Sequence, residues 1–179
     1  MANHAVLIPN KIAAKNIDSK VRPAISASAI DNGNIMQLNQ KSGTSGEPEV
    51  WLATAPTTAS AVRVWMAGAP EQPFAVAGDN VYYGLGNIQD FYTSACTVFT
   101  VFQLSVGDIV TLTSDALDST TAAAYAISVN GKYTLEWSAT APSSGFGLRY
   151  LNTTYIPVAS GSAIGSGRIT AYQFEVYSI

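Results

Sequence analysis

The sequence predicts an all-β protein, with an antiparallel sandwich or barrel-like body and an extended N-terminal arm. Short apolar runs that alternate with polar residues recur along the 179-residue chain, and Gly, Pro, Asn, Ser and Thr separate them. Beyond the first 24 residues no segment has the period of a helix of ten or more residues. Hydrophobic residues make up 47% of the chain, which is enough for one large domain or two small ones.

The first segment, residues 1–24, is expected to form an extended or partly helical arm. Pro9 and Pro23 bracket it, and residues 11–17 permit one or two helical turns. Four basic residues and one acid give the segment a net charge of +3, so the rest of the chain carries −6 of the total of −3. A basic arm on an acidic body favours docking on an acidic neighbour. The residues assigned to this contact are Lys11, Lys15, Lys20 and Arg22.

A β-rich core domain is expected over residues 25–115. Alternation begins at Ile25, and the turn at residues 31–34 leads into a strand because Asn and Gly tolerate positive φ. Residues 68–98 are expected to form a long irregular excursion that contains short strands or serves an interface. The other strand-like runs are residues 35–38, 49–53, 62–67, 98–104 and 109–113, with a Gly-Asp turn at 107–108.

The last third, residues 116–179, is expected to be a β-rich extension that packs on the core or forms a small second domain. Residues 124–129 and 132–137 flank Asn130-Gly131, which predicts a hairpin with a two-residue type I′ turn. Residues 168–177 alternate and close the chain as a strand. Core packing is the commoner role for aromatic side chains in such strands, but tyrosines also suit contact surfaces. The candidates for an exposed patch are Tyr150, Tyr155, Tyr172 and Tyr177.

Residues that carry chemistry are scarce. The chain has one histidine, His4, and one cysteine, Cys96, and only 12% of its residues are charged. Nucleophilic catalysis and metal binding need convergent groups of such residues, so we expect no enzyme, no metal and no cofactor. The apolar context of Cys96 predicts a buried, inert thiol. A glycan hydrolase would need two carboxylates in a cleft, and its candidates are Glu47, Glu49, Glu71 and Glu136.

Two classes of partner are not expected. Basic residues without interleaved aromatic residues are a weak footprint for nucleic acid. No apolar run approaches the roughly 18 residues of a membrane span, and the N-terminus lacks the basic and apolar regions of a secretion signal. The sequence therefore predicts use without export, with no nucleic-acid or membrane partner.

Four segments carry turn motifs in a fixed order: residues 30–38 (IDNGNIMQL), 49–56 (EVWLATAP), 64–71 (VWMAGAPE) and 104–113 (LSVGDIVTLT). An Asn-Gly turn enters a strand, a Pro-Glu follows a later strand and a Gly-Asp turn precedes another. In this order and spacing the chain resembles small tailed-phage virion proteins of the head decoration or capsid-stabilising (cement) kind. The resemblance covers about residues 20–115 and rests on the order of the motifs, not on any single one.

The resemblance implies a non-enzymatic protein that binds the outer surface of a phage capsid and stabilises it. Its partners would be the major capsid protein and copies of itself, and its location would be the virion surface, after the host cytoplasm during assembly. No catalytic residue carries over. The arm hypothesis predicts that deletion of residues 1–22 abolishes capsid binding and leaves the body folded. A receptor- or glycan-binding adhesin module of a phage tail or fibre is the alternative, since it would also explain the Gly/Ser-rich loops and the C-terminal tyrosines.

Overall fold

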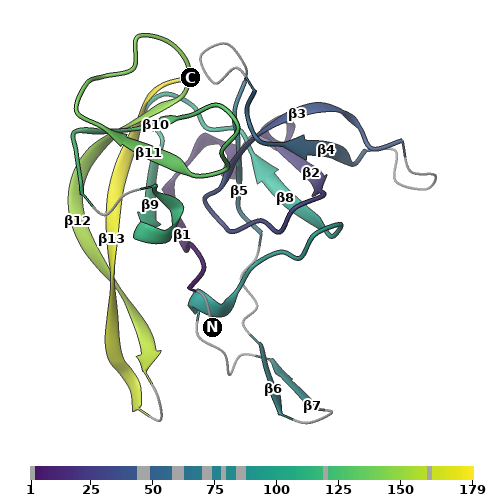
Figure 1. Ribbon diagram of the computed structural model, residues 1–179, viewed down its shortest axis with the longest axis vertical. Coiled ribbons are helices and arrows are strands. Elements are labelled where there is room, and N and C mark those ends of the chain that lie inside the picture. Colours follow the sequence, from purple (N-terminus) through teal and green to yellow (C-terminus); the bar gives the residue numbers. More distant parts are fainter. Residues whose placement is uncertain are drawn as a thin grey trace.

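The computed structural model describes residues 3–43, 49–57, 63–69, 74–77, 80–83, 88–118, 121–160 and 163–179. Their strands form a six-stranded sheet, a closed five-stranded barrel and a separate two-stranded hairpin (Figure 1). The helical turns among these residues are 3₁₀ segments of three residues each. The predicted all-β class is therefore confirmed.

The six-stranded sheet contains both the first and the last strand of the described chain. Every pair of neighbouring strands in it is antiparallel. Its longest members are the last two strands, which pair along almost their whole length and bulge at three places. In spatial order the strands are β1 (Leu7–Lys11), β9 (Ile109–Thr113), β13 (Ala163–Ser178), β12 (Gly147–Ser160), β10 (Tyr125–Ser128) and β11 (Leu135–Ser138).

The barrel comes from the first two thirds of the chain. The first and last strands of its order pair with each other, which closes the ring. One of its strand pairs, β2 with β4, is parallel, and the other four are antiparallel. In order around the ring the strands are β2 (Val21–Ser26), β4 (Trp51–Thr54), β3 (Ile35–Lys41), β5 (Trp65–Ala67) and β8 (Val98–Phe102).

Alternation along these strands builds separate apolar clusters. Met36, Trp65 and Val101 fill the inside of the barrel, whereas their neighbours Ile35 and Met66 face outwards. The outward set joins side chains of the sheet in the largest cluster. This cluster draws on residues 1–24, 25–115 and 116–179, so one core crosses both predicted domain boundaries. A smaller cluster of Val6, Ile156 and Ala171 lies apart from the other two.

The N-terminal segment differs from the predicted arm. β1 pairs with β9 as an edge strand of the sheet, and residues 21–24 already belong to barrel strand β2. Val6 is 0% exposed and lies in one apolar cluster, while its neighbour Leu7 is buried in another. An apolar run that can bury alternate side chains in two clusters is more stable inside the body than in solvent. One helical turn lies within the predicted residues 11–17, as η1 (Ala13–Lys15), and a second, η2 (Asp18–Lys20), follows directly after them.

The hairpin predicted around Asn130-Gly131 is confirmed as a pair, but its two-residue turn is wrong. β10 and β11 pair as far as Ser128 and Leu135, so six residues connect them. A type I′ turn needs positive φ at both central residues, and only Gly131 has it, at 76°. The loop is bonded to the barrel instead of closing on itself, because the Tyr133 carbonyl accepts a 2.7 Å hydrogen bond from the N–H of Ile35 in β3.

Two further expectations meet different outcomes. The excursion predicted over residues 68–98 contains the hairpin of β6 (Phe74–Ala77) and β7 (Asn80–Tyr83), followed by η3 (Ile88–Asp90), as expected.

Cys96 is exposed rather than buried, because it lies in a turn before β8. Its φ of 60° is a left-handed conformation, and its N–H donates to the Ser26 carbonyl at 2.8 Å.

The β12–β13 hairpin projects beyond the rest of the sheet (Figure 1). β12 pairs with β10 only at residues 147–149, and β13 pairs with β9 only at residues 171–175. Beyond these points, residues 151–160 and 163–170 form a ribbon in which each strand pairs, within the described chain, only with the other. The β6–β7 hairpin projects from the same side of the body (Figure 1).

Candidate functional site

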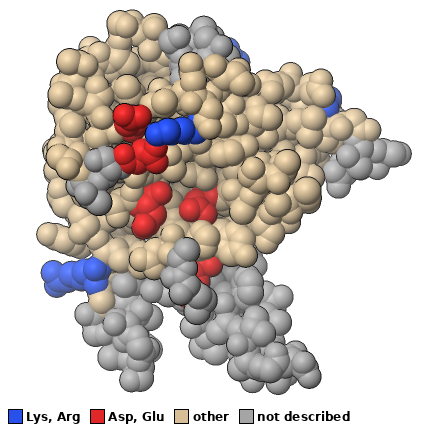
Figure 2. Space-filling model, viewed as in Figure 1, with Lys and Arg blue, Asp and Glu red and all other residues tan. Residues whose placement is uncertain are grey.

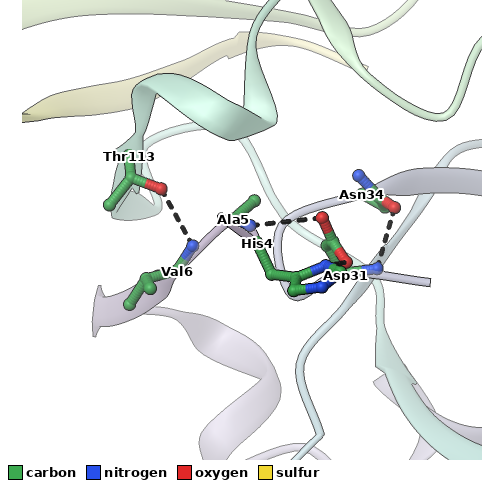
Figure 3. Close-up of polar contacts among 6 residues, drawn as sticks. All are labelled: His4, Ala5, Val6, Asp31, Asn34 and Thr113. Atoms are coloured by element: carbon green, nitrogen blue, oxygen red, sulfur yellow. Dashed lines mark hydrogen bonds and ion pairs between the residues drawn. The ribbon is translucent and has the colours of Figure 1, made fainter. Parts of the chain in front are cut away.

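The only histidine joins the N-terminus to the turn before β3 (Figure 3). His4 Nδ1 lies 2.8 Å from one carboxylate oxygen of Asp31, and the Ala5 N–H donates to the other at 3.2 Å. The Asp31 N–H in turn donates to the Asn34 side-chain oxygen at 3.0 Å. The imidazole also stacks on Tyr92, with ring centroids 4.5 Å apart. We call this arrangement the His4–Asp31 clasp.

The clasp contains two of the three groups that a hydrolytic triad requires. A triad also needs a nucleophile bonded to the imidazole, and no described Ser, Thr or Cys side chain is bonded to His4. Nearby, burial raises the pKa of Asp115; the charge of Asp31 raises it further, whereas a backbone hydrogen bond and the charge of His4 oppose the rise. The contacts of His4 and Ala5 with Asp31 hold the segment that leads into β1 against the turn before β3.

The four basic residues assigned to capsid contact lie in different surroundings. Lys11 is exposed at the end of β1. Lys15 Nζ donates to the Pro9 carbonyl at 2.7 Å, and Lys20 Nζ donates to the Ser105 hydroxyl. The ammonium groups of these two lysines are therefore already hydrogen-bonded within the chain. Whether the exposed parts of these side chains meet a capsid stays a prediction.

Arg22 lies in a more elaborate setting. Its guanidinium carbon is 4.4 Å from the ring centroid of Trp51 and 4.8 Å from that of Trp65. Arg22 also lines a pocket of about 360 Å³, and a second arginine, Arg63, lines the same pocket. Arg63 was not among the candidates predicted from sequence, although it occurs two residues before Trp65 in a predicted strand, where alternation places both on one side.

The four candidate tyrosines do not form a single patch. Tyr150 and Tyr172 are half-buried and pack edge-on against Trp137. Tyr155 and Tyr177 are exposed, but they lie far apart, since Tyr155 is opposite Thr170 in the middle of β13 and Tyr177 is near the end of that strand. At roughly 3.3 Å per residue, the seven residue steps from position 170 to position 177 separate them by about 23 Å.

The projecting ribbon carries the more exposed of these two tyrosines, Tyr155. Tyr155 is 59% exposed and Leu151 is 40% exposed, on a strand whose outer backbone edge is unpaired in the described chain. The buried side chains at the base of the ribbon, Ile156 and Ala171, pack with Val6. One face is thus anchored to the body, while the apolar side chains of the other meet solvent.

The acids proposed for a glycan hydrolase do not converge within the described chain. Glu49 pairs with Lys41 at 3.1 Å. Glu136 lies 3.8 Å from Lys132 Nζ, which also pairs with Asp118. The other two candidates, Glu47 and Glu71, lie outside the described residues. Among the described residues no three His, Cys, Asp or Glu side chains are grouped as a metal site would require.

Comparison with known proteins finds no matching family model, no significantly similar curated protein and no significantly similar solved structure. No helix among the described residues is long and apolar enough to cross a membrane. The functional interpretation therefore depends on the geometry of this chain and on the resemblance of its motifs.

Proposed function

We propose that this chain is a non-enzymatic structural protein that binds the outside of a phage capsid and stabilises it. The β12–β13 ribbon is the observation that carries the proposal. It projects past its neighbouring strands, has an outer edge along residues 151–157 that pairs with no other described strand, and exposes Leu151 and Tyr155. Such an edge adds strands from a partner through main-chain hydrogen bonds, with side chains supplying specificity.

Three further features support this function. The motif order over about residues 20–115 resembles that of capsid decoration proteins. Most of the face drawn in Figure 2 carries neither Lys or Arg nor Asp or Glu, as expected of a surface that is covered in an assembly. Two hairpins project from one side of the body, so both are placed to reach the same surface (Figure 1). Many symmetric copies would multiply a modest contact through avidity.

The proposal is tested by cosedimentation of the purified protein with capsids that lack it. We expect saturable binding of the unmodified chain. The double variant Leu151→Ser/Tyr155→Ser should bind at least about tenfold more weakly, since central apolar and aromatic contacts dominate interface energies. The matched control is Ile17→Ser/Val106→Ser, which removes two exposed apolar side chains away from the ribbon and should bind like the unmodified protein. Absence of binding by the unmodified chain would refute the function.

The adhesin alternative makes a different demand on the isolated protein. An adhesin module would bind a receptor or a glycan without a capsid, and the exposed Tyr155 and Tyr177 are side chains of the kind that contact sugars. Binding to a glycan array together with failure to cosediment with capsids would select the adhesin.

A further inference from the structure

Arg22 lies at one end of the barrel interior. On β2 it is two residues from the fully buried Ala24, so strand alternation points both side chains inwards. On β4 and β5, Trp51 and Trp65 begin their strands at the same end of the ring. The apolar filling of the barrel therefore ends in a guanidinium. We call this end the barrel mouth; it is the pocket lined by Arg22, Gln37, Leu38, Asn39, Arg63 and Trp65.

The Arg22 guanidinium is held before any ligand arrives. Two indole rings lie within 5 Å of its central carbon, at 4.4 and 4.8 Å, and Trp65 is only 3% exposed. Cation–π contacts of this kind keep the charge while restricting the rotation of the long side chain. Less conformational entropy is then lost when a ligand binds.

Within the described part of the chain, no acidic side chain balances the positive charge of the barrel mouth. Arg22 and Arg63 line the same pocket, yet neither forms an ion pair with any described residue. Two like charges that share one pocket repel each other, and an anion between them removes this repulsion. The guanidinium fork matches a carboxylate through two parallel hydrogen bonds.

The two amide side chains that line the pocket already have hydrogen-bond partners within the chain. Gln37 is buried, and its side chain exchanges hydrogen bonds with Thr57, at 3.2 Å from the Thr57 N–H and 3.3 Å to its hydroxyl. The Asn39 amide donates to Thr54 at 3.0 Å. A sugar ring would stack on an aromatic face, but Arg22 covers both Trp51 and Trp65. The volume of about 360 Å³ accommodates one side chain.

We propose that the barrel mouth binds a carboxylate side chain, an Asp or Glu, displayed by the protein shell to which this chain attaches. This inference rests on the proposed function for the identity of the partner, but the carboxylate site itself does not. Of the four basic residues predicted to contact the capsid, this proposal retains Arg22. It adds Arg63, and it locates the contact on the barrel instead of on an arm.

The site is tested first without a capsid, by following tryptophan fluorescence during titration with N-acetyl-glutamate amide. Trp51 and Trp65 contact Arg22, whereas Trp137 lies in a separate cluster, so binding should change the emission saturably. The uncharged N-acetyl-glutamine amide should give no change. Arg22→Gln and Arg63→Gln should each weaken the response at least about tenfold, as expected for loss of a charge-assisted hydrogen bond. Since Arg63 is exposed, its variant keeps the test valid if Arg22→Gln does not fold.

The matched control is Arg149→Gln, which removes the same charge from the sheet, where Arg149 pairs with Glu175. It should leave the titration unchanged. An equal response to the glutamine amide, or tighter binding of inorganic phosphate than of the glutamate probe, would overturn the carboxylate assignment. Tighter binding of glucuronate, lost in Arg22→Gln, would overturn the protein partner and favour an acidic glycan.

Capsid cosedimentation then separates the two proposals. Arg22→Gln/Arg63→Gln should bind capsids at least about tenfold more weakly and with a smaller dependence on salt, while Arg149→Gln binds normally. If the unmodified chain binds capsids and the double variant binds equally well, the site proposal is wrong and the function stands. If the chain takes up the glutamate probe but never binds capsids, the function is wrong and the carboxylate site stands.

Discussion

At the scale of single residues, glycine and asparagine decide the turn that carries the His4–Asp31 clasp. Gly33 has a φ of +90°, and a Cβ atom there would lie 2.6 Å from Cδ2 of the buried Leu112. The position therefore requires glycine for both its backbone angle and its surroundings. Asn34 accepts a hydrogen bond from the Asp31 N–H, which orients the carboxylate that receives His4 and Ala5.

Asp115 gives this region a measurable response to pH. Burial raises its folded-state pKa above the ordinary 3.8, so the charged carboxylate weakens folding at pH values above that raised pKa. We expect Asp115→Asn to be more stable than the unmodified chain at pH 7. The gain should be a fraction of about 1 kcal/mol, because the side chain is partly exposed and its charge is screened.

This advantage should shrink as pH falls through the raised pKa and should have vanished below about 3.8, where the acid is protonated in both states. Urea unfolding at pH 7 and pH 3 measures both differences. A gain from Asp115→Asn that is equal at the two pH values would show that the charge of this carboxylate does not matter.

At the scale of elements, the N-terminal strand is a structural part of the sheet. Val6 is fully buried and its N–H donates to the Thr113 hydroxyl at 2.9 Å. Further along, the Ala13 N–H donates to the buried Asp108 carboxylate at 3.0 Å. Deletion of residues 1–22 would therefore remove an edge strand and part of the barrel, and loss of capsid binding by that deletion would not identify an arm.

A milder change tests the same point. We expect Val6→Ala to lower the free energy of unfolding by about 1–3 kcal/mol, because it leaves a cavity between Val6, Ile156 and Ala171. Ile8→Ala, two residues further on in β1 at a position that is 37% exposed, should cost less than about 1 kcal/mol. Urea denaturation of both variants checks this difference, and equal stability of the two would mean that the strand does not dock as described.

The strands that alternate cleanly could be predicted from sequence, and the pairings that complete the fold could not. Residues 35–38, 98–102 and 109–113 all lie in strands, as the pattern indicates. β12 was not predicted because Asn152 and Pro157 are poor strand formers, and its order comes from pairing with β13. Arg22 was identified by charge alone, since only the parallel pairing of β2 with β4 brings Trp51 beside it.

At the scale of the whole molecule, the sheet and the barrel share one apolar core and together support the β12–β13 ribbon and the barrel mouth. Their largest apolar cluster contains Leu112 and Phe174 from the sheet and Met66 and Phe102 from the barrel. The support orients the β12–β13 ribbon and the barrel mouth without help from a partner. A ribbon edge that pairs with no other described strand would favour aggregation in a free protein, and Pro157 and Arg168, paired across the ribbon, limit it.

The central claim is that this molecule attaches to the outside of a capsid. Low-resolution electron imaging of capsids with and without the protein tests it most directly. We expect added density at symmetry-related positions on the outer surface of the shell, with the ribbon end of each copy towards it. Particles that gain no density on the shell, or gain it only at the tail, would contradict the account.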